Sequence, residues 1–346
     1  MFKRILAWSQ LLKLGRAGVV AAKEAQIFLE TNIINVLSEE GWFEFLKIPR
    51  TVEELIEHYQ YTDKKLTQEI LDALVEVNTV KMSKEARYQT YQVEDTVLIP
   101  KFFTDAITDL WRNYAKALIP RLKGKYIPFS GGAALYNWDD ALSARIYEVG
   151  RSGAFTYAGT MKRTGKLLDV GCGNGYGTTI IWSRYYKRNR FYPGSNMEII
   201  GIDINEELLR IAREERILRL SRLLGKREEE LQSLEPHFPK FIKGTVLDIP
   251  FENETFDMVF LSQVLHWTDA QRGLRELLRV TKPEGIIFGA QGMYPTANKF
   301  ADFHVTTVEN ATGFFYKEDF QRWAKAAGAK RVYMTTPLTI YKILKS

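Results

Sequence analysis

The sequence predicts an α/β protein in which a mainly parallel β-sheet follows a mainly helical N-terminal domain. Strand-like and helix-like segments alternate over residues 161–346, as in a parallel sheet that is covered by helices on both faces. Within residues 167–177 an apolar strand runs into a turn with a glycine at every second position. Helical patterns followed by two short strand-like segments occupy residues 1–100. We therefore expect three regions, at 1–100, 101–160 and 161–346.

The first region predicts helices and then a hairpin. Apolar residues recur at helical spacing over 27–37, and Thr51 and Glu54 have the spacing of a capping box. Thr62 or Asp63 begins a further helix. Strand-like segments follow at Val80 to Met82 and at Tyr88 to Tyr91. Helices followed by a hairpin are a winged-helix arrangement.

A winged helix raises nucleic-acid binding as an alternative function. The helix after Asp63 would enter the groove. It begins with Lys64 and Lys65, but its later acidic residues would repel phosphate; they are Glu69, Asp72 and Glu76. Net charge is +6, from 48 basic and 42 acidic residues that are interleaved along the chain. Such mixing is typical of solvated helix faces, so nucleic acid is an unlikely partner.

Residues 101–160 are rich in aromatic side chains and predict a helical linker. We expect most of these rings to pack in a core or between domains, and some to line a substrate pocket. Tyr157 is the candidate contact from this region.

The third region supplies the sheet. Its expected parallel strands alternate with helices and are Lys166 to Val170, Glu198 to Asp203, Lys240 to Val246, Phe256 to Leu261, and Gly285 to Ala290. A long charged helix is expected from Glu206 to about Leu234. A helix at Asp319 to Ala327 precedes two more strands, Arg331 to Thr335 and Leu338 to Leu344. Two strands with so short a connection must be antiparallel.

The glycine turn removes side chains, so that a ligand can lie against bare backbone at the start of the next helix. Dinucleotide-binding turns need glycines at relative positions one, three and six. Counted from Gly171 the sixth position is Tyr176, and counted from Gly173 it is Thr178. The turn therefore does not fit the dinucleotide fingerprint.

Five motifs in order resemble class I S-adenosylmethionine-dependent methyltransferases. The glycine turn with Asp169 before it is similar to the family's first motif, and the strand that ends at Asp203 is similar to its second. The later motifs are matched by residues 246–251, by 256–259 with 264–267, and by 279–285, where Glu284 replaces the usual glycine. The resemblance covers roughly half of the chain. It implies a Rossmann-like, seven-stranded sheet with an antiparallel last strand, and S-adenosyl-L-methionine as cofactor.

The resemblance also implies where the cofactor binds. Asp203 would accept hydrogen bonds from both ribose hydroxyls, and Asp248 would accept from the adenine amine, with Ile249 packed on the ring. Backbone N–H groups of the glycine turn would bind the methionine carboxylate. The implied cofactor-binding residues are Asp169, Gly171, Cys172, Gly173, Asn174, Gly175, Asp203, Ile204, Asp248, Ile249, Ser262 and Gln263. No metal site is expected, and the single cysteine, Cys172, is interpreted as a small residue tolerated in the turn.

Catalysis requires an acceptor held in line with the methyl group and, where needed, a base for its proton. Of the four histidines (His58, His237, His266 and His304), His266 follows the fourth strand, beside the expected methyl group. Leu265-His266-Trp267 partly resembles a stretch that supplies the general base in small-molecule O-methyltransferases with a dimerising N-terminal domain. The related histidine of quinone C-methyltransferases packs or contacts substrate, so both roles stay open for His266. The candidate substrate contacts are Tyr157, Trp267, Met293 and His304.

The leading hypothesis is a cytoplasmic homodimer that methylates a small aromatic or apolar acceptor, with O-methylation preferred. C-methylation of a quinone-like or lipid acceptor is the alternative. In that case the amphipathic segment Met1 to Leu14 could contact a membrane surface, although we prefer to interpret it as a dimer-interface helix. A protein that binds the cofactor without catalysis is a further alternative.

Overall fold

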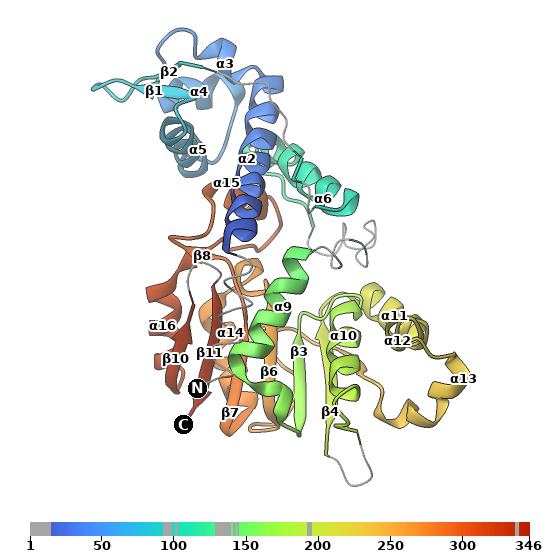
Figure 1. Cartoon of the computed structure of the whole chain (residues 1–346). Coiled ribbons are helices and arrows are strands. Elements are labelled where there is room, and N and C mark those ends of the chain that lie inside the picture. Colours follow the sequence, from blue (N-terminus) through green and yellow to red (C-terminus); the bar gives the residue numbers. More distant parts are fainter. Residues whose placement is uncertain are drawn as a thin grey trace. The chain divides into compact units, whose positions relative to one another are not determined.

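The computed structural model describes residues 15–92, 99–100, 103–128, 140, 143, 145–191, 196–335 and 339–346. They form two compact units (Figure 1). The first holds the large sheet and contains the described residues of 140–296 and 314–346. The second contains the described residues of 15–128 together with Ala297–Gly313. The amphipathic segment Met1 to Leu14 lies outside the described residues.

Seven strands form the sheet, in the order β10-β11-β7-β6-β3-β4-β5. The parallel strands are β3 (Lys166–Val170), β4 (Glu198–Asp203), β5 (Lys240–Lys243), β6 (Phe256–Ser262) and β7 (Thr281–Ala290). β11 (Ile340–Lys345) is antiparallel to both of its neighbours, β7 and β10 (Ala329–Met334). The predicted sheet is confirmed. Strand order reverses between β3 and β6, and open α/β sheets bind ligands at such a switch point.

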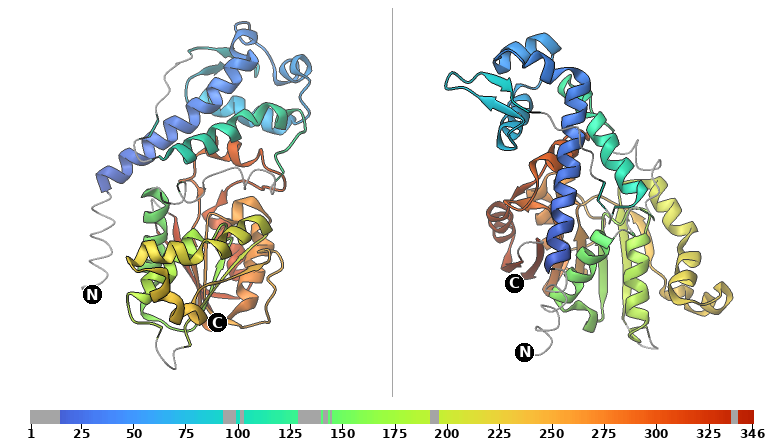
Figure 2. Two further views of the ribbon diagram at one scale, coloured as in Figure 1. Left: turned by 90° about the vertical axis from the view of Figure 1, so that its right-hand side faces the viewer. Right: turned by 45° about the horizontal axis from the view of Figure 1, so that its top comes forward.

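Helices cover both faces of the sheet, as the parallel strands require (Figure 2). On one face α9 (Arg145–Ala158) and α10 (Tyr176–Tyr186) pack Phe155 and Trp182 against Leu167 and Phe260. On the other face α14 (Ala270–Val280) and α16 (Lys317–Ala326) pack against the alternate residues of the same strands, such as Leu168 and Val259. A short 3-10 turn, η2 (Thr160–Lys162), links α9 to β3.

The charged helix expected from Glu206 to about Leu234 is divided in the structure. It forms α11 (Glu206–Glu214), α12 (Arg216–Leu224), α13 (Glu228–Leu231) and the 3-10 helix η3 (Gln232–His237). Gly225 ends α12 in the left-handed conformation, with φ of 65°. The prediction of one continuous helix was wrong, and glycine as a helix terminator explains the break after α12.

The second unit begins with α2 (Gly15–Glu40), α3 (Trp42–Phe45), α4 (Val52–Tyr59) and α5 (Lys64–Glu76). Thr51 and Glu54 form the predicted capping box of α4, and Asp63 caps α5 by accepting from the Leu66 N–H. β1 (Val80–Met82) and β2 (Tyr88–Thr90) form the predicted antiparallel hairpin. The winged-helix identity of this unit stays a prediction. Among the described residues no helix combines the length and apolar character that crossing a membrane requires.

The second unit also contains a segment from the far end of the chain. α15 (Lys299–Val305) packs with α2 and with α6 (Asp105–Lys116), which is followed by α7 (Leu118–Leu122). The backbone of Ile127 bridges Val308 in parallel. The chain leaves the sheet unit at β8 (Met293–Tyr294) and returns at β9 (Phe315–Tyr316), which pairs with β8.

The two units therefore differ from the three regions expected from the sequence. The predicted linker at 101–160 is split, because α6 and α7 belong to the second unit whereas the apolar face of α9 packs on the sheet. The predicted domain at 161–346 is interrupted by Ala297–Gly313.

Candidate functional site

The predicted cofactor residues follow the C-terminal ends of neighbouring strands. The glycine turn follows β3, Asp203 ends β4, and Ser262 ends β6, with Gln263 directly after it. Because β6, β3 and β4 are adjacent and parallel, the structure brings these residues to one edge of the sheet. This edge contains the switch point, where the sequence analysis placed the site.

The glycine turn is held to β4 by its own backbone. The N–H groups of Gly171 and Cys172 both donate to the Ile202 carbonyl, at 2.8 and 3.0 Å. Gly173 N–H donates to Asp203 Oδ2 at 2.8 Å, and Gly175 N–H donates to the Cys172 carbonyl at 3.0 Å. The sequence predicted that these groups would bind a carboxylate. In the structure the N–H groups of these four residues have acceptors within the protein, and the binding of a carboxylate by this turn stays a prediction.

Two glycines show why side chains are excluded from this turn. Gly171 has φ of 70°, and a Cβ there would lie 2.6 Å from Val264 Cγ2 in the loop after β6. Gly173 has φ of 55°, but no protein atom lies within 4 Å of the place where its Cβ would be. The turn thus packs closely against the β6 loop on one side and presents bare backbone at Gly173.

Asp203 has a structural role in addition to its predicted one. Its Oδ1 accepts from Asn205 N–H at 2.9 Å while Oδ2 holds Gly173. Burial raises the pKa of this carboxyl group, and its backbone hydrogen bonds oppose the rise. A carboxylate has about four lone-pair sites, so it can still accept from a hydroxyl donor. Asn174, at the tip of the turn, is buried and accepts from Tyr176 N–H through Oδ1 at 3.2 Å.

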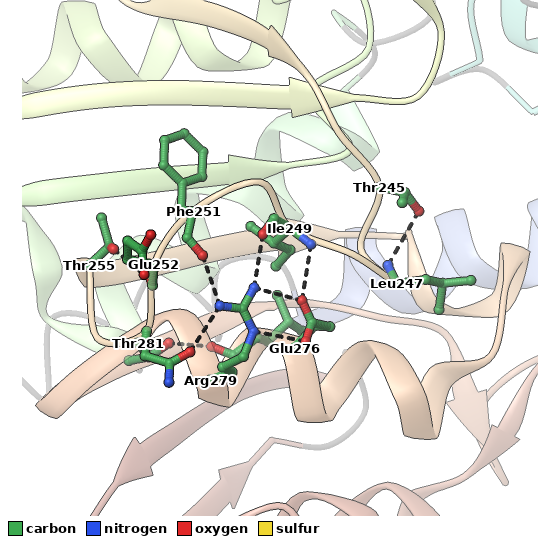
Figure 3. A network of polar contacts seen from close by, with 11 residues as sticks. Thr245, Leu247, Ile249, Phe251, Glu252, Thr255, Glu276, Arg279 and Thr281 are labelled. Atoms are coloured by element: carbon green, nitrogen blue, oxygen red, sulfur yellow. Dashed lines mark hydrogen bonds and ion pairs between the residues drawn. The ribbon is translucent and has the colours of Figure 1, made fainter.

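Asp248 is exposed on the loop after β5. An ion pair between Arg279 and Glu276 supports the backbone of this loop (Figure 3). Arg279 donates to the Ile249 and Phe251 carbonyls, both at 2.8 Å, and pairs with Glu276. Glu276 in turn accepts from Ile249 N–H at 3.0 Å. The pair fixes the backbone that carries Asp248. The Ile249 side chain belongs to the hydrophobic core, so the half-exposed Ile204 after β4 offers the larger apolar surface at this edge.

Asp169 is buried beneath the turn beside a residue that the sequence analysis missed. Burial raises the pKa of Asp169 to about 7, although a hydrogen bond from Thr178 Oγ1 at 2.6 Å and the charge of Arg151 oppose the rise. Arg151 on α9 is itself 6% exposed and pairs with Glu148. Burial also raises the pKa of the Cys172 thiol well above its usual range, so Cys172 is a neutral small residue here. No group of His, Cys, Asp and Glu among the described residues has an arrangement that would hold a metal ion.

His266 is buried in the short 3-10 helix η4 (Leu265–Trp267), directly after β6. Its Nδ1 lies 2.7 Å from Nε2 of Gln291, a residue that the sequence analysis did not select. The rings of Trp267 and Phe314 pack on it, with centroids 4.6 and 4.9 Å away. Burial lowers the pKa of His266 to about 3, and the contact with Gln291 opposes the shift. His266 is therefore a neutral imidazole at physiological pH.

The other predicted substrate residues are divided between the two units. Trp267 donates to the Gln263 carbonyl at 3.0 Å, and Gln263 Oε1 accepts from Gly292 N–H at 3.1 Å. Met293 is buried in β8, and Tyr157 on α9 is partly buried against the sheet. His304 belongs to the second unit, where its Nδ1 donates to the Phe300 carbonyl at 2.6 Å and burial lowers its pKa to about 4. Its contact with a substrate stays a prediction.

Comparison with known proteins agrees with this site. Residues 168–289 match the family model described as a methyltransferase domain. An uncharacterized methyltransferase of Schizosaccharomyces pombe is 34% identical over 128 residues, which cover 37% of this chain and 40% of that protein. The ubiquinone/menaquinone biosynthesis C-methyltransferase UbiE of Idiomarina loihiensis is 25% identical over 227 residues, covering 64% of this chain and 79% of that protein. The chain spans about half the length of most curated relatives that it matches.

The solved structure of the DszA carbon methyltransferase has the same fold. The TM-score is 0.69 at 14% identity, and the match covers 98% of this chain and 93% of that chain. The family model and the curated relatives support S-adenosylmethionine as the methyl donor.

Proposed function

We propose that this protein transfers the methyl group of S-adenosylmethionine to a small acceptor molecule. The observation that carries the proposal is the edge of the sheet at the switch point, where Asp203 lies beside the bare backbone of Gly173. A carboxylate at a strand end suits the two ribose hydroxyls, and the exposed Asp248 suits the adenine amine. Bound there, the cofactor supplies a methyl group already activated by its sulfonium. The protein then has to orient the acceptor and exclude water.

Calorimetric titration with S-adenosylmethionine tests the first part. We expect binding of S-adenosylmethionine and of S-adenosylhomocysteine, and none of a nicotinamide dinucleotide, because the glycine spacing excludes the dinucleotide fingerprint. Binding of the dinucleotide alone would contradict the proposal. The expected homodimer is carried forward as part of the proposal, and sedimentation of the full chain would test it.

Two acceptor classes follow from the sequence, oxygen and carbon. We place carbon of a quinone-like acceptor first, because the Idiomarina relative that aligns with 64% of this chain is named for C-methylation of such a molecule. The buried neutral His266 agrees with this order. O-methylation of a hydroxyl group generally needs a base at that place, and an imidazole with a pKa of about 3 is a poor one.

Isotope-labelled methyl transfer distinguishes the two classes. Naphthohydroquinone, kept anaerobic, is offered as the carbon acceptor and a simple catechol as the oxygen acceptor. We expect label on a ring carbon of the naphthohydroquinone. Label on the catechol oxygen alone would restore O-methylation as the leading function.

A further inference from the structure

The most informative contact in the sheet unit is the one between His266 and Gln291, because it decides which ring nitrogen carries the proton. Gln291 directly follows β7, and its own N–H donates to the Thr339 carbonyl at 3.0 Å, which fixes its backbone. Its side chain is 3% exposed and lies against η4. Because this amide is buried, the hydrogen-bonding groups around it decide which way its oxygen and its nitrogen point.

Three contacts orient the Gln291 amide. Its Oε1 accepts from Leu265 N–H at 3.1 Å, while its Nε2 donates to the Gly292 carbonyl at 3.3 Å and faces His266 Nδ1 at 2.7 Å. The reversed orientation would place the NH₂ group against the Leu265 N–H and the oxygen against the Gly292 carbonyl. Both of these contacts would be repulsive, so Nε2 is the atom that faces the histidine.

An amide NH₂ group only donates hydrogen bonds, so His266 Nδ1 must accept and cannot carry a proton. The proton of the neutral ring is therefore on Nε2. The contact with Gln291 occupies Nδ1, and His266 as a whole keeps a small exposed surface, at 4%. Nε2–H is therefore the group of the ring that is left for a ligand.

Charge does not reverse this assignment. The pKa of His266 is lowered by burial, and the one opposing influence is the hydrogen bond with Gln291. The groups that face the ring are the Gln291 amide and the aromatic rings of Trp267 and Phe314, none of which is charged. Within the described part of the chain, no charged group therefore contributes to the shift, and the ring stays neutral through the physiological range.

We propose that Gln291 is a positioning residue that holds His266 as a hydrogen-bond donor, and that His266 stabilises an oxyanion of the acceptor instead of removing its proton. The proposal deepens the proposed function and rests on it. It implies an acceptor that ionises before it binds, such as a hydroquinone or an enol. An acceptor that must lose its proton to the enzyme is excluded.

The chemical step balances without a protein base. The acceptor loses its hydroxyl proton to solvent and binds as an oxyanion that accepts from His266 Nε2–H. A bond forms between the methyl group and the ring carbon beside the oxyanion, and the methyl–sulfur bond breaks, with its electron pair staying on the neutral thioether. The ring carbon then releases its hydrogen as a proton to solvent, which restores the aromatic hydroquinone.

The variant that tests the proposal is Gln291→Glu. One oxygen of the new carboxylate can still accept from Leu265 N–H. Its second oxygen would accept from His266 Nδ1–H, so the neutral ring would carry its proton on Nδ1 and Nε2 would be unprotonated. The pKa of His266 would rise beside the carboxylate. Gln321→Glu, which adds the same charge on the exposed surface of α16, is the control.

Nitrogen NMR of the histidine rings gives the first result, with no acceptor needed. The His266 signals are assigned by their loss in His266→Gln. We expect a protonated Nε2 in the wild-type protein. In Gln291→Glu, at a pH where the ring is neutral, we expect an unprotonated Nε2. A wild-type ring protonated on Nδ1 would overturn the proposal, whether or not methyl transfer is observed.

Methyl transfer to naphthohydroquinone gives the second result. In mildly alkaline buffer we expect Gln291→Glu to lose about 10²-fold or more in kcat/KM, because an oxyanion donor is lost. Activity should recover in mildly acidic buffer, where the imidazolium regains its Nε2–H. If His266 were a general base, Gln291→Glu would instead raise activity in alkaline buffer, and that result would refute the assignment.

A third variant and a binding measurement separate the possible failures. His266→Gln keeps an N–H donor but no base, so partial activity is expected from it under the proposal and none under base catalysis. All variants should bind S-adenosylmethionine as the wild-type protein does. If the wild type binds the cofactor but methylates only the catechol, the carbon assignment fails while the NMR result still decides the tautomer.

Discussion

Replacing Asp203 with asparagine should weaken S-adenosylmethionine binding in addition to weakening the fold. The carboxylate accepts from Gly173 N–H at 2.8 Å and from Asn205 N–H at 2.9 Å, and asparagine has a single oxygen with which to accept. A hydrogen bond to a charged group contributes about 1.5–3 kcal/mol. Asp203→Asn therefore loses one hydrogen bond from a backbone N–H group and one from a ribose hydroxyl. The ribose bond alone corresponds to a decrease in affinity of about 10- to 150-fold.

Calorimetry of the wild-type protein, Asp203→Asn and Glu198→Gln measures this effect. Glu198 is an acid at the opposite end of the same strand, where it pairs with Lys240 at 2.7 Å, so its change to glutamine removes equal charge far from the edge. We expect an unchanged Kd for Glu198→Gln, and a loss of stability no larger than about 1 kcal/mol, as for other exposed ion pairs. Equal Kd values for all three proteins would refute the placement of the ribose at Asp203.

Three further predictions concern the same edge. The cofactor's ammonium should lower the pKa of Asp169 from about 7. Cofactor affinity should therefore rise as pH approaches 7 and level off above it. In a calorimetric pH series, the same slope of affinity against pH in Asp169→Asn would contradict this. Gly173→Ala and Gly225→Ala each place a methyl group in open space, at φ of 55° and 65°, so each should cost about 1–2 kcal/mol of stability. In titrations only Gly173→Ala should weaken cofactor binding. The charge of Arg151 favours the ionised form of Asp169, so Arg151→Met should weaken binding of S-adenosylhomocysteine but not of methylthioadenosine, which lacks the amino-acid end. Equal weakening of both in titrations would mean that Arg151 serves only the fold.

The sheet could be predicted from the sequence because its strands are continuous apolar segments bounded by turns. All seven predicted strands overlap observed ones, and the antiparallel end followed from the short connection before Ile340. The insertion of Ala297–Gly313 into the second unit could not be predicted in this way. Its helix has the same local pattern whichever unit it packs against, so only tertiary contacts such as the bridge from Ile127 to Val308 reveal it.

The site residues that lie within recognisable sequence motifs could be predicted. Asp203 and Gly173 were selected by position, although their mutual hydrogen bond was not foreseen. Arg151 and Gln291 were missed because each lies outside the matched motifs. The available signal for Arg151 was its spacing of three residues from Glu148 on α9, because a buried arginine needs an acidic partner. Gln291 offered no signal, because its role depends on facing His266 from another strand.

The neutral state of His266 agrees with the charge of the reaction. A histidine that removed the acceptor's proton would become an imidazolium close to the cofactor's sulfonium. Two like charges in a site of low effective dielectric constant repel more strongly than they do in water. The transferred methyl group cancels the sulfonium charge only as the reaction proceeds, so this repulsion would be present from the start. A ring that donates from Nε2 while Gln291 occupies Nδ1 avoids the repulsion and still stabilises the oxyanion, which the positive sulfonium also favours.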